Sequence, residues 1–486
     1  MPKLPIALLM CAILAGCAPM REGPTPSPRL DGAQVDLVDT AITWPTDNWW
    51  TRYGDPQLNA LVEDALRNSP SLSRAQARLA QANAAVGSAR SALLPSVAAD
   101  YQLTRQRLSE NYIYPAPLAG SITTDQRLAL DFSYEIDFWG KNRSAFESAV
   151  AGQQASAADA QAARVVLTGG VVQAYLNLQN AFAQHAVLTD IIRQNSEVLD
   201  ITRNRFTNGL DTQVEVRQAE SQLAATRVEQ TQAETRIAQL RNQVAALTGA
   251  GPSRGATLMP AQLTRPAGVL PSQLPLELLG RRPEIVAARW RAEAATKNID
   301  VAKAMFFPNV DLTAFVGFQA LGLHNLLQGS SRAAGVGPAI TLPIFQGGAL
   351  NANLAGQRAS ADEATADYNE AVINAVNQVA DALDALRLLD REREAQTQAR
   401  TAIDAAYALA RDRYRAGLGN YLVVLIAQNS VMTQALRDTD LRMRAYLLDA
   451  QLARALGGGY ATPADATATP IRPAPISADA SSASAR

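Results

Sequence analysis

The chain carries two copies of one pattern, and this duplication constrains its fold more than any other feature. Residues 68–97 (NSPSLSRAQARLAQANAAVGSARSALLPSV) match residues 281–310 (RRPEIVAARWRAEAATKNIDVAKAMFFPNV) at a shift of 213 positions, with Pro70 aligned to Pro283. Further on, RFTNGLDTQVEV (205–216) matches RYRAGLGNYLVV (413–424) at a shift of 208. Repeats of this length indicate a fold built from equivalent units that pack against each other.

Both copies predict the same order of elements: a helix, two strands, a very long helix, a turn and a further helix. We expect the first repeat over residues 58–250, the second over 275–457, and a Gly/Pro-rich linker over 251–274. The helices of the first repeat are expected over about 58–93, 142–205 and 212–247, and heptad spacing in both repeats favours coiled-coil packing. A single helix over 142–205 would be about 95 Å long, which describes a rod or the wall of a tube.

Alternating residues predict strands at about 96–139 and 309–346. Within residues 127–140 (RLALDFSYEIDFWG) every second residue is apolar, and the other positions include Asp131, Glu135 and Asp137. Three carboxylates on one face are costly in a dry core, which favours a water-filled lumen beside them. A small sandwich with a polar outer face is the alternative. Four strands cannot close a membrane barrel, whereas three chains would together supply twelve strands.

The N-terminus predicts export and lipid anchoring. Lys3 precedes an apolar run that is too short to span a bilayer and that ends in LAGC, the pattern of a bacterial lipobox, at Cys17. We expect residues 1–16 to be a signal peptide, residues 17–57 to be a lipidated N-terminal segment, and Cys17 to carry the acyl chains. An ordinary signal peptide that happens to end near a cysteine is the alternative. The export signal favours the membrane barrel over the sandwich.

Composition excludes several classes of function. The 44 basic and 45 acidic residues nearly cancel, which leaves no electrostatic footprint for nucleic acid. The only cysteines are Cys11 and Cys17 and the only histidines are His185 and His324, so we expect no disulfide and no metal site. Nucleophile motifs and phosphate loops are absent as well, so we expect neither an enzyme nor a cofactor. Residues 458–486 are rich in Pro, Ala, Ser and Thr and are predicted to be a disordered tail.

Four motifs in order along the duplicated chain resemble the outer-membrane factor family, the TolC-like exit ducts of efflux systems, and within it the lipoprotein branch. They are WWTRYGDPQLNALVEDAL (49–66) before the first repeat, DFWGKNR (137–143) at a strand-to-helix junction, LELLGRRPEIVAAR (276–289) at the start of the second repeat, and YRAGLGNYLVVLIAQ (414–428) at a hairpin tip. The resemblance covers about residues 44–457. It implies an α+β membrane protein, a homotrimer whose 12-stranded β-barrel, with four strands per chain, continues into a long α-helical coiled-coil tunnel in the periplasm.

The resemblance also implies function and partners. It implies a passive exit duct in the outer membrane, surrounded by outer-membrane lipid, that conducts substrates delivered by a periplasmic adaptor protein and an inner-membrane transporter. A channel of the same architecture for protein secretion remains an alternative, because nothing in the tips separates drug, metal or protein cargo. A trimeric coiled-coil surface structural protein is the alternative from a different class, and the paired strand sets count against it.

The two tips, at Gly209 and Gly417, have both a structural and a functional interpretation. Each glycine suits the left-handed position that ends a helix, and each is followed by a capping signal, from Thr212 with Glu215 in the first tip and from Asn420 in the second. The resemblance implies that four residues contact the adaptor: Gly209, Leu210, Gly417 and Leu418.

The resemblance further places the tunnel constriction just beyond the second tip, at Leu422 and Ile426. Members of the family often carry an aspartate at the position of Ile426, so we expect an apolar plug here instead of an acidic ring. Glu215 and Tyr414 match positions that hold the mouth closed in some members, and we hypothesise a hydrogen bond between them. The alternative is that Glu215 only completes the capping box.

Overall fold

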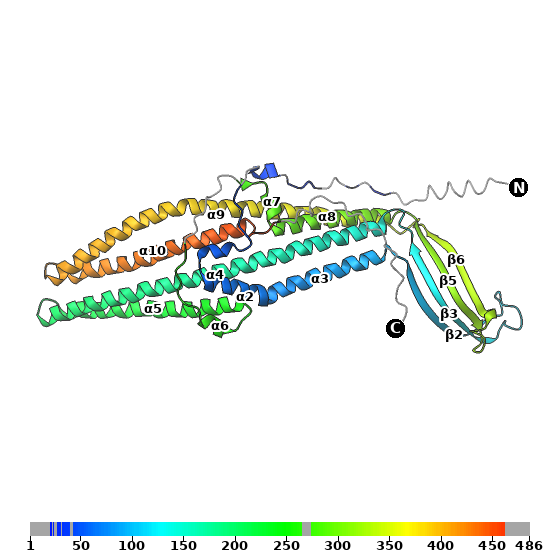
Figure 1. The fold of residues 1–486 in the computed structure, drawn as a ribbon, viewed down its shortest axis with the longest axis horizontal. Coiled ribbons are helices and arrows are strands. Elements are labelled where there is room, and N and C mark those ends of the chain that lie inside the picture. Colours follow the sequence, from blue (N-terminus) through cyan, green and yellow to red (C-terminus); the bar gives the residue numbers. More distant parts are fainter. Residues whose placement is uncertain are drawn as a thin grey trace, which may run out of the picture.

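The computed structural model describes residues 20–264 and 274–461, apart from residues 22, 24–26, 31 and 39–41. The described chain forms an elongated rod of helices with a four-stranded sheet at one end (Figure 1). The first copy consists of α3 (Pro70–Ser91), β2 (Ser96–Arg107), β3 (Ile122–Glu135), α4 (Lys141–Thr207) and α5 (Gln213–Leu247). The second consists of α8 (Pro283–Ala304), β5 (Asn309–Leu321), β6 (Arg332–Thr341), α9 (Ala349–Arg415) and α10 (Tyr421–Ala455).

The corresponding helices of the two copies are equal in length. α3 and α8 have 22 residues, α4 and α9 have 67, and α5 and α10 have 35. At 1.5 Å per residue, α4 and α9 are each about 100 Å long. α4 packs against α3, α5, α8 and α10, whereas α9 packs against α8 and α10. Each long helix is therefore matched along its length by two shorter ones, as the sequence predicts.

Short elements surround the middle of the rod, where the largest hydrophobic core lies. Its buried residues include Trp49, Trp50, Leu58 and Tyr175, which join the N-terminal elements to the centre of α4. The short elements are η1 (Gly32–Val35), β1 (Leu37–Val38), η2 (Trp49–Tyr53), α2 (Pro56–Asn68), α6 (Pro252–Ala256), β4 (Leu274–Pro275) and α7 (Leu278–Arg281), and η3 (Gly329–Ser331) lies between β5 and β6. None of the described helices combines the length and the apolar composition needed to cross a membrane.

The single helix expected over 58–93 is instead two helices, α2 and α3. Ser69, between them, is extended (φ −70°, ψ 124°), and Pro70 begins α3. Proline lacks an N–H and disfavours the helical conformation of the preceding residue, so the helix ends before it. Arg282 is extended in the same way (φ −104°, ψ 111°) before Pro283. The aligned prolines thus break both copies at the same place.

The sheet carries the alternation of β3 across all four strands. Its order is β2-β3-β5-β6, and every pairing is antiparallel. One face holds a row of paired apolar residues: Ala99, Leu130, Val316 and Ala334. The opposite face holds all the acidic residues of the strands and one arginine, which are Asp100, Asp125, Arg127, Asp131, Glu135 and Asp311. The other arginines of the strands share the face of Leu130 but lie next to the β2–β3 and β5–β6 connections: Arg105, Arg107 and Arg332. The register therefore produces one apolar face and one polar face.

The strand expected over 127–140 ends at Glu135. Asp137 lies in the connection to α4, where its carboxylate accepts a hydrogen bond from the backbone N–H of Arg143 at 2.8 Å. The first N–H groups of a helix have no partner within the helix, so this carboxylate helps to start α4. The prediction that Asp137 continues the polar face of the strand is therefore wrong, whereas Asp131 and Glu135 lie on that face.

Candidate functional site

The two tips lie together at the end of the rod opposite the sheet (Figure 1). Gly209 and Gly417 have φ angles of +74° and +79°, in the left-handed region that favours glycine. In each tip two backbone N–H groups donate back to the last turn of the long helix, which is the Schellman arrangement. The four bonds run from Leu210 to Arg205 (2.9 Å), Gly209 to Phe206 (3.0 Å), Leu418 to Arg413 (2.8 Å) and Gly417 to Tyr414 (3.1 Å).

The helices that leave the tips begin at the predicted caps. The Thr212 hydroxyl accepts from the N–H of Val214 at 3.2 Å, and the Glu215 carboxylate accepts from the N–H of Thr212 at 2.8 Å. These bonds form the predicted capping box. The Asn420 side chain accepts from the N–H of Val423 at 3.2 Å. Both capping predictions are confirmed.

The hypothesised hydrogen bond between Glu215 and Tyr414 is wrong. The Glu215 carboxylate is occupied at the surface by Thr212, whose hydroxyl also donates to it at 2.5 Å. Tyr414 is fully buried, and its hydroxyl donates instead to the Asp211 carboxylate. The same hydroxyl lies 3.1 Å from the hydroxyl oxygen of Thr202. Asp211 therefore takes the role that sequence reasoning gave to Glu215, four positions later.

Arg205 joins Asp211 and Tyr414 into one cluster. Its Nε and Nη2 donate to the two Asp211 oxygens at 2.8 and 3.1 Å, and its Nη1 donates to the Tyr414 carbonyl at 2.8 Å. The guanidinium also lies over the Tyr414 ring, 4.5 Å from its centroid. The side chains of Arg205 and Asp211 are only 10% and 9% exposed. We call Thr202, Arg205, Asp211 and Tyr414 the tip cluster, since it ties the first tip to the second.

The tip cluster holds Asp211 ionised. Burial by itself raises the pKa of Asp211, but hydrogen bonds from Arg205 and Tyr414 outweigh burial and leave the pKa below its usual value. The hydrogen bond to Asp211 raises the pKa of Arg205. Burial, and then the bond to Asp211, raises the pKa of Tyr414. At neutral pH the cluster is thus a buried ion pair that receives a hydrogen bond from a neutral phenol.

Buried side chains behind the tip cluster hold the two copies together. An apolar cluster that includes Val198, Val216, Tyr407 and Val424 draws on α4, α5, α9 and α10. Further along, the Asn195 side chain donates to Thr226 on α5 and accepts from Gln428 on α10, each at 2.9 Å. The tips are therefore the exposed end of a continuous contact between the first and second copies.

The residues expected at the adaptor contact and the constriction are exposed. Leu210 and Leu418 are 63% and 72% exposed, and Leu422 and Ile426 are 57% and 58% exposed. Leu422 and Ile426 are four residues apart on one face of α10, and Leu418 precedes them in the turn of the tip. Unlike Tyr414, none of these four side chains is buried within one chain.

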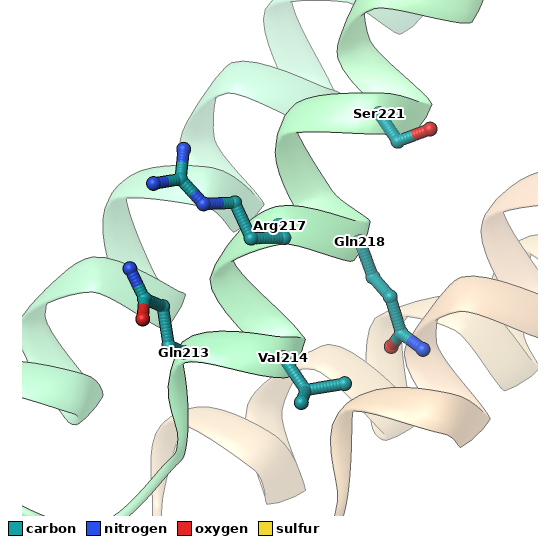
Figure 2. Close-up of a pocket in the computed structure, with 5 residues that line it drawn as sticks. All are labelled: Gln213, Val214, Arg217, Gln218 and Ser221. Carbon is teal, nitrogen blue, oxygen red and sulfur yellow. The ribbon is translucent and has the colours of Figure 1, made fainter.

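An open groove of about 650 Å³ follows the first turns of α5. It is lined by Gln213, Val214, Arg217, Gln218 and Ser221 (Figure 2). Figure 2 shows Val214 and Gln218 on one side of the helix and Gln213 and Arg217 on the other. The groove is a surface feature of the first tip, next to the capping box.

The remaining predicted residues lie elsewhere. On the polar face of the sheet, Asp131 accepts two hydrogen bonds from Arg127, and Glu135 pairs with Lys141 at 2.6 Å. Among the described residues, no group of three or more Asp, Glu, His or Cys side chains is placed to hold a metal ion. Cys17, the expected signal peptide over 1–16 and most of the expected tail lie outside the described residues.

Comparison with known proteins identifies the family. A family model described as "Outer membrane efflux protein" matches residues 61–250 and 274–458, which cover both copies. The chain belongs to the outer membrane efflux protein family. It is 34% identical over 477 residues to the multidrug resistance outer membrane protein MdtP of Shigella flexneri, across 93% of this chain and 96% of MdtP. It is 38% identical over 358 residues to the fusaric acid resistance protein FusA of Burkholderia cepacia, across 71% of this chain and 67% of FusA.

A solved structure agrees with this assignment. The outer membrane protein VceC of Vibrio cholerae superposes with a TM-score of 0.82 at 36% identity, over 86% of this chain and all of the VceC chain. The predicted fold class is confirmed, since this efflux protein supplies a four-stranded sheet, one chain's share of a β-barrel, and a long helical tunnel wall. The protein is an outer-membrane exit duct of an efflux system. Its family is one of membrane channels and not of enzymes.

Proposed function

We propose that three copies of this efflux protein assemble into one channel, with a barrel of twelve strands and a tunnel of helices. The observation that carries the proposal is the open sheet, in which β2 and β6 each pair with a single strand. The free edge of such a sheet exposes backbone N–H and C=O groups, which cannot face hydrocarbon. Three copies would close the barrel, with the apolar face toward lipid and the polar face toward water.

The channel would conduct its cargo passively after delivery from an inner-membrane transporter through a periplasmic adaptor protein. Two relatives support small toxic molecules as cargo, because MdtP is named for multidrug resistance and FusA for fusaric acid resistance. Their names favour drug efflux over the protein-secretion channel that the sequence left open. Acylation of Cys17 would anchor each chain to the outer membrane beside the barrel.

The tips would form both the adaptor contact and the gate. Gly209, Leu210, Gly417 and Leu418 support the first role, because they are exposed at the extreme end of the rod. Leu422 and Ile426 from three chains would close the tunnel as an apolar constriction, by packing and dewetting. The tip cluster would hold each chain in the closed arrangement, since it binds the second tip to the first through buried polar bonds.

Conductance in planar bilayers tests this function. The full-length protein should form pores of low open fraction, and the double change Leu422→Gly with Ile426→Gly should raise conductance by removing the apolar constriction. Val423→Gly is the matched control, since Val423 is similarly exposed at 54% but lies about 100° around the helix from Leu422. A protein that forms no pores, even with both glycines in place, would contradict the proposed channel.

A further inference from the structure

The Tyr421 hydroxyl is buried in the tip without a hydrogen-bond partner among the described residues. Tyr421 is the first residue of α10, and it is 2% exposed. Burial alone raises the pKa of Tyr421 to about 12. Buried polar groups nearly always have a partner, so this exception calls for an explanation.

Tyr414, seven residues earlier, is the opposite case. The two rings are neighbours, with centroids 6.0 Å apart, and both belong to the apolar cluster behind the tip. The Tyr414 hydroxyl is satisfied by Asp211, so its bond favours the arrangement in which the tips are tied. The Tyr421 hydroxyl gains nothing from the same arrangement. The hydroxyl groups of these two neighbouring tyrosines therefore have opposite effects on the stability of the contact between the tips.

The apolar cluster that contains Tyr421 is formed partly by the other copy. It includes Val198 and Leu199 of α4 and Val216 and Ala219 of α5. Tyr421 itself leaves the second tip directly, one residue after the cap Asn420. If α9 and α10 move away from α4 and α5, the cluster separates and the Tyr421 hydroxyl reaches water.

We propose that the buried Tyr421 hydroxyl favours separation of the two tips, whereas the Tyr414–Asp211 bond favours the tied tip, in which the tip cluster joins them. An unsatisfied buried hydroxyl disfavours the state that buries it, and hydration in the untied state removes that penalty. The Tyr414 hydroxyl then stabilises the contact between the two tips, and the Tyr421 hydroxyl destabilises it. The free energy needed to separate the two copies at the tips is therefore lower than the Tyr414–Asp211 bond alone would give. The gating part of this inference rests on the proposed channel.

The test compares two chemically identical changes, Tyr421→Phe and Tyr414→Phe, in the full-length protein. Removing the unpartnered hydroxyl should slow hydrogen exchange of backbone amides in residues 202–216 and 414–428, whereas removing the partnered one should accelerate it. The open fraction in planar bilayers should fall about fivefold or more in Tyr421→Phe, which corresponds to the ~1 kcal/mol lower limit for an unmet buried donor. It should rise in Tyr414→Phe.

Each outcome decides the inference. Unchanged or faster exchange in Tyr421→Phe would overturn it, because the hydroxyl would then be satisfied in the tied tip. Slower exchange with an unchanged open fraction would also overturn it, because the strain would not be coupled to opening. If neither the wild-type protein nor any variant forms pores, the proposed channel is refuted, while the exchange rates still decide whether Tyr421 strains the tied tip.

Discussion

Asp211→Asn tests whether the tip cluster holds the two tips together. Asparagine keeps the size of the side chain and removes its charge, which leaves the Arg205 cation without a counter-ion. Loss of one partner from a buried ion pair costs about 3–5 kcal/mol. The two side chains are 10% and 9% exposed, so solvent screens the pair little. The Tyr414 carbonyl still accepts from Arg205, and we therefore expect the lower end, about 3 kcal/mol.

A cost of this size would shift the balance between tied and untied tips by about 100-fold, since each 1.4 kcal/mol is about tenfold. The expected result is a correspondingly higher open fraction in planar bilayers, measured on the full-length protein. Circular dichroism should show unchanged helix content, because the change removes a contact between the tips and leaves the long helices intact.

Asp190→Asn is the matched control. Asp190, on α4, likewise pairs with an arginine, Arg193 at 2.8 Å, but these two side chains are 65% and 69% exposed. Exposed pairs of this kind contribute about 0–1 kcal/mol. If Asp211→Asn opens the channel no more than Asp190→Asn does, the tip cluster does not hold the tips. The double variant with Tyr414→Phe should fall short of the sum of the single effects, because both changes remove the same bond.

Three further predictions concern pH, the tip glycines and the polar face of the sheet. The pKa of Asp211 is lowered in the folded protein, so its carboxylate stabilises the contact between the tips at pH values above its usual pKa of 3.8 and loses this effect as pH falls through the lower folded pKa. Protonation of Asp211 should therefore not raise conductance between pH 7 and pH 5. A rise over this range in the wild-type protein that is absent from Asp211→Asn would contradict this prediction. Gly417→Ala should destabilise the tip by about 1–2 kcal/mol because of its positive φ, measured as faster amide exchange. Gly87→Ala, four residues before the end of α3 and with free space around it, should instead stabilise its helix by about 0.5–1 kcal/mol. The polar face carries five carboxylates and one arginine, so reversal potentials should show preference for cations, and Asp100→Asn with Asp311→Asn should weaken that preference; an anion-selective pore would contradict the assigned faces.

The long elements were predictable because their signals are local and occur twice. Heptad spacing, the aligned prolines and the glycines of the tips placed α4, α9 and both Schellman turns close to where the structure has them. Thr212 and Asn420 were predictable as caps because a cap acts within three residues of itself. The break between α2 and α3 also had a local signal in Pro70, but the expectation of one helix over 58–93 did not take this proline into account.

The tip cluster was not predictable in the same way. Arg205 and Asp211 are six residues apart across a helix end, and only the reversal at Gly209 brings their side chains together. Their partner Tyr414 comes from the other copy, which no spacing rule connects to Asp211. Likewise Asp137 has the right parity for the polar face, but the chain leaves the strand at Glu135, and its carboxylate is used by α4. Contacts made by reversals and by the second copy require the three-dimensional arrangement.

The equal lengths of α4 and α9 couple the two halves of the gene to each other. A single codon inserted within α4 would advance its tip by about 1.5 Å and turn it by about 100° relative to the other tip. Asp211 would then leave Tyr414, although every residue of the cluster was still encoded. Length changes in one half are therefore tolerable only when the other half changes by the same number of codons, so insertions and deletions in these helices should be inherited in pairs.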